Sequence, residues 1–158
     1  MVDAPAPALM RQKSTVPTST NNTESTVLKK PIQDIWKNLR EFKLEALAPG
    51  KVEATSWTDG AAGTVGGLVE VVYKNGSKWL FQITELSDKH HSISYRVVVA
   101  EPAMEVSSLE GDIQLRRVTS DDTTFLSWCT DFSNDADAEI IQDQKFKKLD
   151  FFAEAESQ

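Results

Sequence analysis

The stretch LVEVVYKNGSKWLFQI, residues 68–83, decides the fold of this chain. Two runs rich in β-branched and aromatic residues, Leu68–Tyr73 and Trp79–Ile83, flank the dipeptide Asn75-Gly76. An Asn-Gly pair between such runs is the strongest short-range signal of a β-hairpin, because both turn residues tolerate a positive φ. We therefore predict two antiparallel strands joined by a tight turn at Asn75-Gly76.

The same alternation of apolar runs and turn residues continues on both sides of this hairpin. Turn-forming pairs separate the runs at Asp59-Gly60, Ser87-Asp88, Glu101-Pro102 and Asp121-Asp122. Successive hairpins without an intervening helix build an antiparallel sheet. The predicted strands are Thr26–Lys29, Val52–Thr58, Thr64–Tyr73, Lys78–Leu86, Ser92–Ala100, Val106–Val118 and Thr123–Phe132.

Helices are predicted before and after these strands. Pro31 suits the first turn of a helix, and apolar residues follow it at helical spacing. A second short helix spans residues 42–47 and ends at Pro49-Gly50. The last helix starts at a capping residue, Asn134 or Asp135, with acidic residues in its first turn and lysines further along.

Composition places the chain among single-domain globular proteins. It has 158 residues, a formal net charge of −7 and one cysteine. The acidic balance argues against nucleic acid as a partner, and no apolar run reaches the length of a membrane span, so we expect no stable membrane insertion. Residues 1–24 are rich in Pro, Ser, Thr and Asn and lack a secretory pattern. We predict a disordered tail at 1–24, a folded domain at 25–158 and a cytoplasmic location; the oligomeric state is left open.

Alternation along the predicted strands separates a dry face from a solvated one. The helices are the only elements that can cover the dry face. Two small residues on that face, Gly67 and Gly111, are expected to leave room there. A curved sheet closed by one long helix tends to enclose space, and such a cleft suits an apolar small molecule.

Five segments in this order resemble the START-like helix-grip superfamily, to which birch-pollen-type allergens belong. The segments are PIQDIW (31–36), VGGLV (65–69), SISYRV (92–97), LEGDIQL (109–115) and TFLSW (124–128). In pattern the chain is most similar to the polyketide cyclase/dehydrase family of that superfamily. The resemblance covers residues 25–156 and implies an α+β helix-grip fold, with a six- to seven-stranded antiparallel sheet around the last helix. Val69 and Leu109 stand where the family pattern has arginine and tyrosine, which implies a less polar cavity.

The sequence leaves three functions open. The first is non-enzymatic binding of a hydrophobic small molecule or lipid between the sheet and the last helix. The second is a polyketide cyclase/dehydratase-like enzyme, against which the lack of an inward His, Asp or Glu argues. The third is a protein-interaction module with a collapsed cavity.

Candidate ligand contacts follow from the dry face and from one face of the last helix. His90 and His91 are expected in a turn, so we predict no catalytic residue, no metal and no cofactor. The ligand-binding residues predicted on the sheet are Val69, Val71, Tyr73, Trp79, Phe81, Ile83, Tyr95, Val97, Leu109, Trp128 and Thr130, and those on the last helix are Ile141, Lys145, Leu149 and Phe152.

Overall fold

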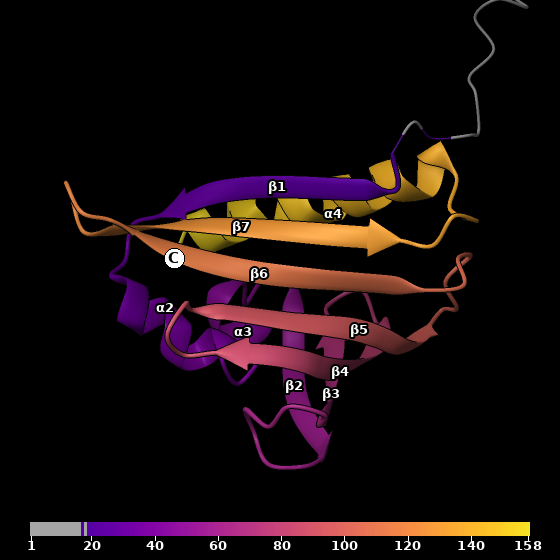
Figure 1. Cartoon of the computed structure of the whole chain (residues 1–158), viewed down its shortest axis with the longest axis horizontal. Coiled ribbons are helices and arrows are strands. Elements are labelled where there is room, and N and C mark those ends of the chain that lie inside the picture. Colours follow the sequence, from indigo (N-terminus) through magenta and orange to yellow (C-terminus); the bar gives the residue numbers. More distant parts are fainter. Residues whose placement is uncertain (1–16, 18) are drawn as a thin grey trace, which may run out of the picture.

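The computed structural model describes Pro17 and residues 19–158 as a curved antiparallel sheet that wraps around a long helix (Figure 1). The seven strands lie in the order β1-β7-β6-β5-β4-β3-β2. This arrangement confirms the predicted α+β helix-grip architecture. The elements are β1 Asn21–Leu28, α2 Ile32–Leu39, α3 Leu44–Leu47, β2 Val52–Asp59, β3 Leu68–Tyr73, β4 Lys78–Ser87, β5 Ser92–Glu101, β6 Leu109–Val118, β7 Thr123–Phe132 and α4 Ala138–Glu156.

Strand β1 starts earlier than the sequence predicts. It begins at Asn21 rather than Thr26 and pairs with β7 from Asn21↔Asp131 to Leu28↔Thr124. Its first residues are polar, so no apolar pattern marks them as a strand in the sequence. Their backbone pairing with β7 holds them in the sheet. Strand β1 thus reaches into the segment assigned to the tail, of which residues 1–16 and 18 lie outside the described residues.

The predicted hairpin joins β3 to β4, but its turn differs from the expected two-residue form. Only Gly76 has a positive φ, of 89°. The Gly76 amide donates to the Tyr73 carbonyl at 2.9 Å, and the Tyr73 amide donates to the Ser77 carbonyl at 2.9 Å. Asn75 contributes its side chain instead, because its Oδ1 accepts from the Ser77 amide at 2.9 Å. The turn is therefore a three-residue loop with glycine in the left-handed position.

The predicted dry face forms the core. Inward side chains of the middle strands, such as Val71, Ile83 and Ile113, are at most 1% exposed. The alternation fails at one place in β5, where Phe81 pairs with Val97 and Leu80 pairs with Val99. The extra residue between them is a β-bulge, which turns Val99 outward to 49% exposure.

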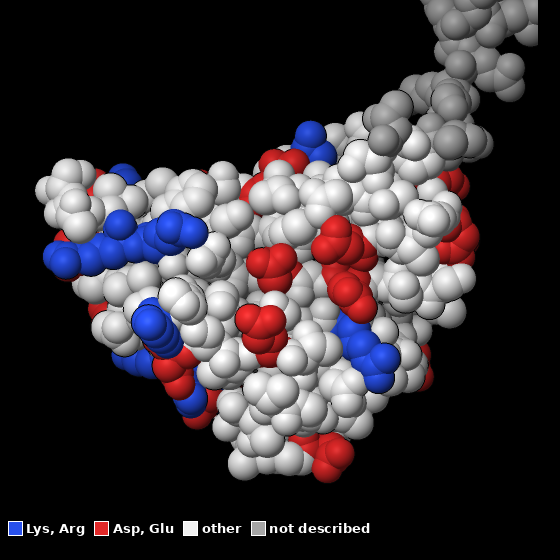
Figure 2. All heavy atoms as spheres, in the orientation of Figure 1, with Lys and Arg blue, Asp and Glu red and all other residues white. Residues whose placement is uncertain are grey.

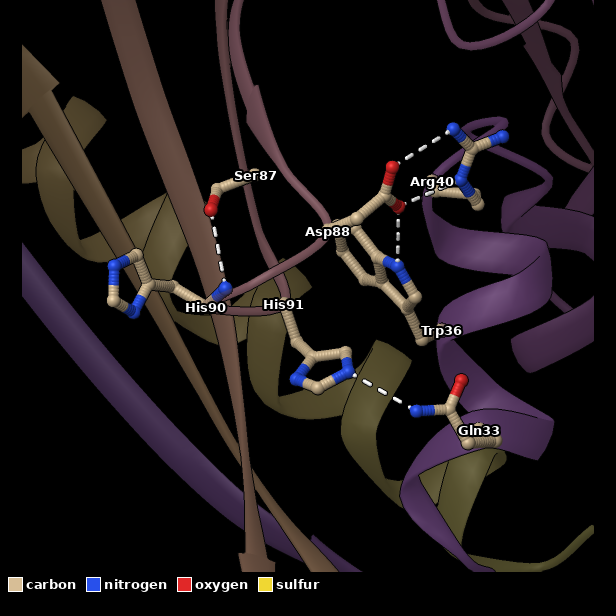
Figure 3. Close-up of polar contacts among 7 residues, drawn as sticks. All are labelled: Gln33, Trp36, Arg40, Ser87, Asp88, His90 and His91. Carbon is tan, nitrogen blue, oxygen red and sulfur yellow. Dashed lines mark hydrogen bonds and ion pairs between the residues drawn. The ribbon is translucent and has the colours of Figure 1, made fainter.

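Helix α2 is attached to the turn between β4 and β5 (Figure 3). The Asp88 carboxylate accepts from Arg40 Nε at 2.9 Å and from Trp36 Nε1 at 2.8 Å. These bonds, the one from Arg40 first, hold the pKa of Asp88 below its usual value. The ring of His91 lies 3.2 Å from the Gln33 amide, whereas the His90 side chain points away from α2. Both histidines thus belong to this turn.

Helix α4 is tied to the edge strand β1 and capped at its start. Asp137 is the N-cap and accepts from the Ile140 amide at 2.8 Å, so the predicted cap at Asn134 or Asp135 was wrong by two to three residues. Asp135 instead accepts from the Ser107 amide at 2.9 Å. Polar contacts then join α4 to β1, from Lys145 to Glu24, from Lys148 to Asn22 and from Glu156 to Thr26.

Candidate ligand-binding cavity

A cavity of about 430 Å³ lies between the concave face of the sheet and α4. Its volume falls within the range of small-molecule sites, about 300–1,000 Å³. It runs from exposed residues near the β3–β4 turn to buried side chains under α4. The lining residues are Leu44, Gly50, Lys51, Tyr73, Lys74, Asn75, Ser77, Trp79, Phe81, Tyr95, Leu109, Trp128, Thr130, Gln144, Lys147, Lys148, Asp150 and Phe151.

Tyr95 and Trp128 form the inner end of the cavity. The indole Nε1 of Trp128 donates to the Tyr95 hydroxyl at 2.8 Å, which satisfies a polar atom that is otherwise buried. Burial raises the pKa of Tyr95 well above its ordinary value. The hydroxyl is therefore neutral at physiological pH and serves to hold the indole in place.

Aromatic rings build the wall contributed by β3, β4 and β5. The Phe81 ring lies 5.0 Å from the Tyr95 ring and 6.0 Å from the Trp79 ring. Tyr73 contacts Trp79 edge-on at 6.4 Å, and burial raises its pKa above the ordinary value. On the far side Phe42 packs against Phe81 at 5.0 Å. Rings in contact at these distances support one another and give the wall a fixed shape.

Helix α4 contributes a mixed polar and apolar face. Residues 144, 147, 148 and 151 line the cavity at helical spacing, and Phe151 contacts the Trp128 ring at 5.4 Å. Lys148 is only 6% exposed. Its Nζ donates to the Trp128 carbonyl at 3.0 Å and to the side-chain and backbone oxygens of Asn22 at 3.1 and 3.3 Å. Burial lowers the pKa of this ammonium from 10.5 to about 8.

The two glycines of the dry face do not leave empty space as expected. A Cβ on Gly111 would lie 2.4 Å from the Tyr95 hydroxyl oxygen, and one on Gly67 would lie 2.8 Å from the Trp57 ring. Tyr95 and Gly111 are direct cross-strand partners. Each glycine therefore makes room for an aromatic ring, and the cavity lies beyond the Tyr95 ring rather than above Gly111.

Seven of the fifteen predicted contacts line the cavity, and all seven come from the sheet. The other predicted sheet residues, Val69, Val71, Ile83 and Val97, are buried in the core beside it. On α4, Lys145 pairs with Glu24 at 3.7 Å and Leu149 is 36% exposed. The seven on the wall are Tyr73, Trp79, Phe81, Tyr95, Leu109, Trp128 and Thr130.

The helix contacts were placed on a neighbouring face of α4. The predicted helix contacts are Ile141, Lys145, Leu149 and Phe152, of which Ile141 is half-buried and Phe152 packs 6.3 Å from the Trp128 ring. The face on the cavity carries the polar residues Gln144, Lys147 and Lys148 beside Phe151, so no continuous apolar stripe marks it in the sequence. The basic residues near the β3–β4 turn, Lys51 and Lys74, were missed for the same reason.

Comparisons with known proteins place the fold. No protein-family model and no curated protein sequence matches this chain. A solved structure of a protein from Nitrosospira multiformis is 23% identical, with a TM-score of 0.74 over 87% of this chain and 94% of that one. Major latex-like protein 151 from Panax ginseng is 15% identical, with a TM-score of 0.66 over 85% and 90%. Ara h 8.0201 is 18% identical, with a TM-score of 0.67 over 87% and 95%.

These similarities and the strand order define the class of the molecule. It has the helix-grip fold of the birch-pollen-allergen type, as the sequence resemblance implied. The similarity to polyketide cyclases in particular is not part of what these structures show. Within the described residues, every helix is too short or too polar to cross a lipid bilayer.

Proposed function

We propose that this protein binds a hydrophobic small molecule or lipid in the cavity between the sheet and α4. The cavity itself carries the proposal, because a volume of about 430 Å³ bordered by rigid aromatic rings would be filled by side chains in a domain that needed only stability. A ligand that buries about 300 Å² of apolar surface gains about 7–8 kcal/mol. The cost of association, about 4 kcal/mol or more, offsets at least half of this gain, so tight binding needs polar contacts in addition to apolar burial.

The contacts in the cavity favour binding over a cyclase/dehydratase reaction. The Tyr95 hydroxyl is engaged by the Trp128 indole, and the Lys148 ammonium donates to Asn22 and to the Trp128 carbonyl. Both histidines lie in the β4–β5 turn beside α2. Acid–base catalysis needs a group free to exchange a proton with the substrate. The Tyr95 hydroxyl and the Lys148 ammonium are engaged in structural bonds, and neither histidine lines the cavity.

A neutral fluorescent probe tests the proposal. N-phenyl-1-naphthylamine should bind the folded protein with one site per chain and brighten as it leaves water. Gln144→Trp places a large ring on the cavity face of α4 and should weaken binding at least tenfold. Gln142→Trp adds the same ring to the exposed side of the same helix and should leave binding unchanged.

Two results would count against the proposal. If the folded protein does not bind the probe, the cavity is not a site for apolar molecules. If Gln142→Trp and Gln144→Trp reduce binding equally, the probe binds elsewhere on the surface.

A further inference from the structure

The charge of the cavity lining is opposite to that of the chain. The protein carries 24 acidic and 17 basic residues, and acidic side chains gather over the centre of the outer face of the sheet (Figure 2). Outward positions there include Glu110, Asp112 and Asp131. The cavity lining contains four lysines, Lys51, Lys74, Lys147 and Lys148, and one acidic residue, Asp150. Positive charge is thus concentrated where a ligand would enter.

Two of these lysines have only surface ion pairs. Lys74 contacts Glu53 at 2.8 Å and Lys147 contacts Asp143 at 3.1 Å, and in both pairs about half of each side chain is exposed. Exposed pairs of this kind contribute little, so a ligand anion can compete for either lysine. The Glu154 carboxylate lies beside Gly50, where it accepts from the Gly50 amide at 2.9 Å, and it is not at ion-pair distance from these two lysines.

The other two lysines have no carboxylate at ion-pair distance within the described residues. Lys51 is exposed at the entrance. Lys148 is buried deeper and bonds only to neutral oxygens, from Asn22 and Trp128. Loss of solvation lowers its pKa to about 8, and the groups that act in the opposite direction, Cys129 on β7, Glu24 on β1 and Asp112 on β6, do not offset it. An anion in the cavity would supply the negative charge that compensates this buried ammonium.

The cavity also has a polarity gradient along its length. Its inner part is bordered by Phe81, Tyr95, Leu109 and Phe151, which are all buried, and its outer part by the exposed lysines. An apolar chain or ring placed inside would leave a charged end at the entrance.

On the basis of the function proposed above, we infer that the cavity selects amphipathic ligands with one anionic group. The apolar part lies against the aromatic wall, and the anion, a carboxylate, sulfate or phosphate, lies at the entrance beside Lys51 and Lys147, with the buried Lys148 further in. A neutral molecule of the same shape fits the wall equally well but meets uncompensated positive charge at the entrance.

The test compares two ligands that differ only in their polar end, decanoate and decan-1-ol, each displacing N-phenyl-1-naphthylamine at pH 7 and below its aggregation limit. Decanoate should bind at least tenfold more tightly than decan-1-ol. The double variant Lys51→Gln/Lys147→Gln should lose most of this preference while it retains its affinity for decan-1-ol. The control Lys37→Gln/Lys89→Gln makes the same change in net charge at exposed positions outside the cavity lining and should keep the preference.

The outcomes separate this inference from the proposed function. Equal affinity for the two ligands, or tighter binding of the alcohol, would overturn the anion preference and leave the binding function intact. Loss of the preference in the control variant as well would show that net charge, rather than the entrance lysines, causes it. Failure to bind the probe and both ligands would overturn both proposals.

Discussion

Replacing Gly111 by alanine should destabilise the protein strongly, although it adds one methyl group. The new Cβ would lie 2.4 Å from the Tyr95 hydroxyl oxygen and 2.5 Å from Cζ of the same ring. Ordinary contact begins near 3.4 Å, so the ring must move by about 1 Å. Tyr95 is 3% exposed and packed against Phe81, and its hydroxyl accepts from Trp128 at 2.8 Å. Overpacking costs about 1–3 kcal/mol and the loss of this hydrogen bond about 0.5–1.5, so we expect a loss of about 2–4 kcal/mol in unfolding free energy.

The measurement is equilibrium unfolding in urea, followed by the fluorescence of the four tryptophans. A second background isolates the cause. In Tyr95→Leu the ring is absent, so adding Gly111→Ala should cost less than about 0.5 kcal/mol, or stabilise by a similar amount because alanine restricts the unfolded chain. The two positions should therefore show a coupling of at least about 1.5 kcal/mol. An equal cost of Gly111→Ala in both backgrounds would refute the reasoning, since the loss would then come from the backbone and not from the ring.

Three further predictions concern single polar side chains. The pKa of Lys148 is lowered in the fold, so the unfolded chain holds more protons than the folded one between pH 8 and 10, and the unfolding free energy should rise by about 1–2 kcal/mol from pH 7.5 to 9.5. Lys148→Met should lose this rise. If the variant and the wild type show parallel pH profiles, the titration of Lys148 does not cause the rise. Asp88→Ala removes the acceptor of Trp36 and Arg40 and should lower the thermal midpoint at pH 7. Because the pKa of Asp88 is lowered in the fold, the difference in midpoint between variant and wild type should shrink as acid protonates this carboxylate. A difference that stays constant with pH would exclude the charge of Asp88 as the cause of the lower midpoint. Asp137→Ala removes the cap of α4 and should lower the unfolding free energy, measured in urea, by about 1 kcal/mol. Asp137→Asn keeps an acceptor and should stay close to the wild type. If both variants lose the same free energy, the cap is not the cause of the loss.

The strands and their inward faces could be predicted because a sheet with one dry face repeats every two residues. A strand shifted by one residue would turn its apolar side chains away from the core, so the alternation around Asn75-Gly76 fixes which side chains of each neighbouring strand face inward. The exceptions are local. The bulge at residue 98 changes the phase of Val99 without any break in its apolar run, and β1 uses polar residues up to Ser25 because β7 supplies its hydrogen-bond partners.

The face of α4 that meets the cavity could not be predicted by the same rule. A helix that packs on a filled core places its largest apolar residues inward, and that expectation selected Ile141 and Leu149. Here the space beside the helix is partly open, so Gln144 and Lys148 can lie inward. The burial of Lys148 also depends on acceptors from Asn22 and from the Trp128 carbonyl, which the fold brings together from distant parts of the sequence.

Lys148 is the position where stability and the proposed function make opposite demands. A methionine fills nearly the same volume, needs no solvation and should make the protein more stable near pH 7, because it removes the cost that lowers the pKa of the ammonium. The carbonyl of Trp128 and that of Asn22 belong to paired strands, so the loss of Lys148 does not remove their ladder partners. A side chain that lowers stability and yet faces a cavity is most readily explained by what the cavity holds. If Lys148→Met raises the unfolding free energy and weakens the binding of decanoate more than that of decan-1-ol, the lysine is present for the ligand. If the variant lowers the unfolding free energy and leaves the binding of both ligands unchanged, the lysine is present for the contact between α4 and β1.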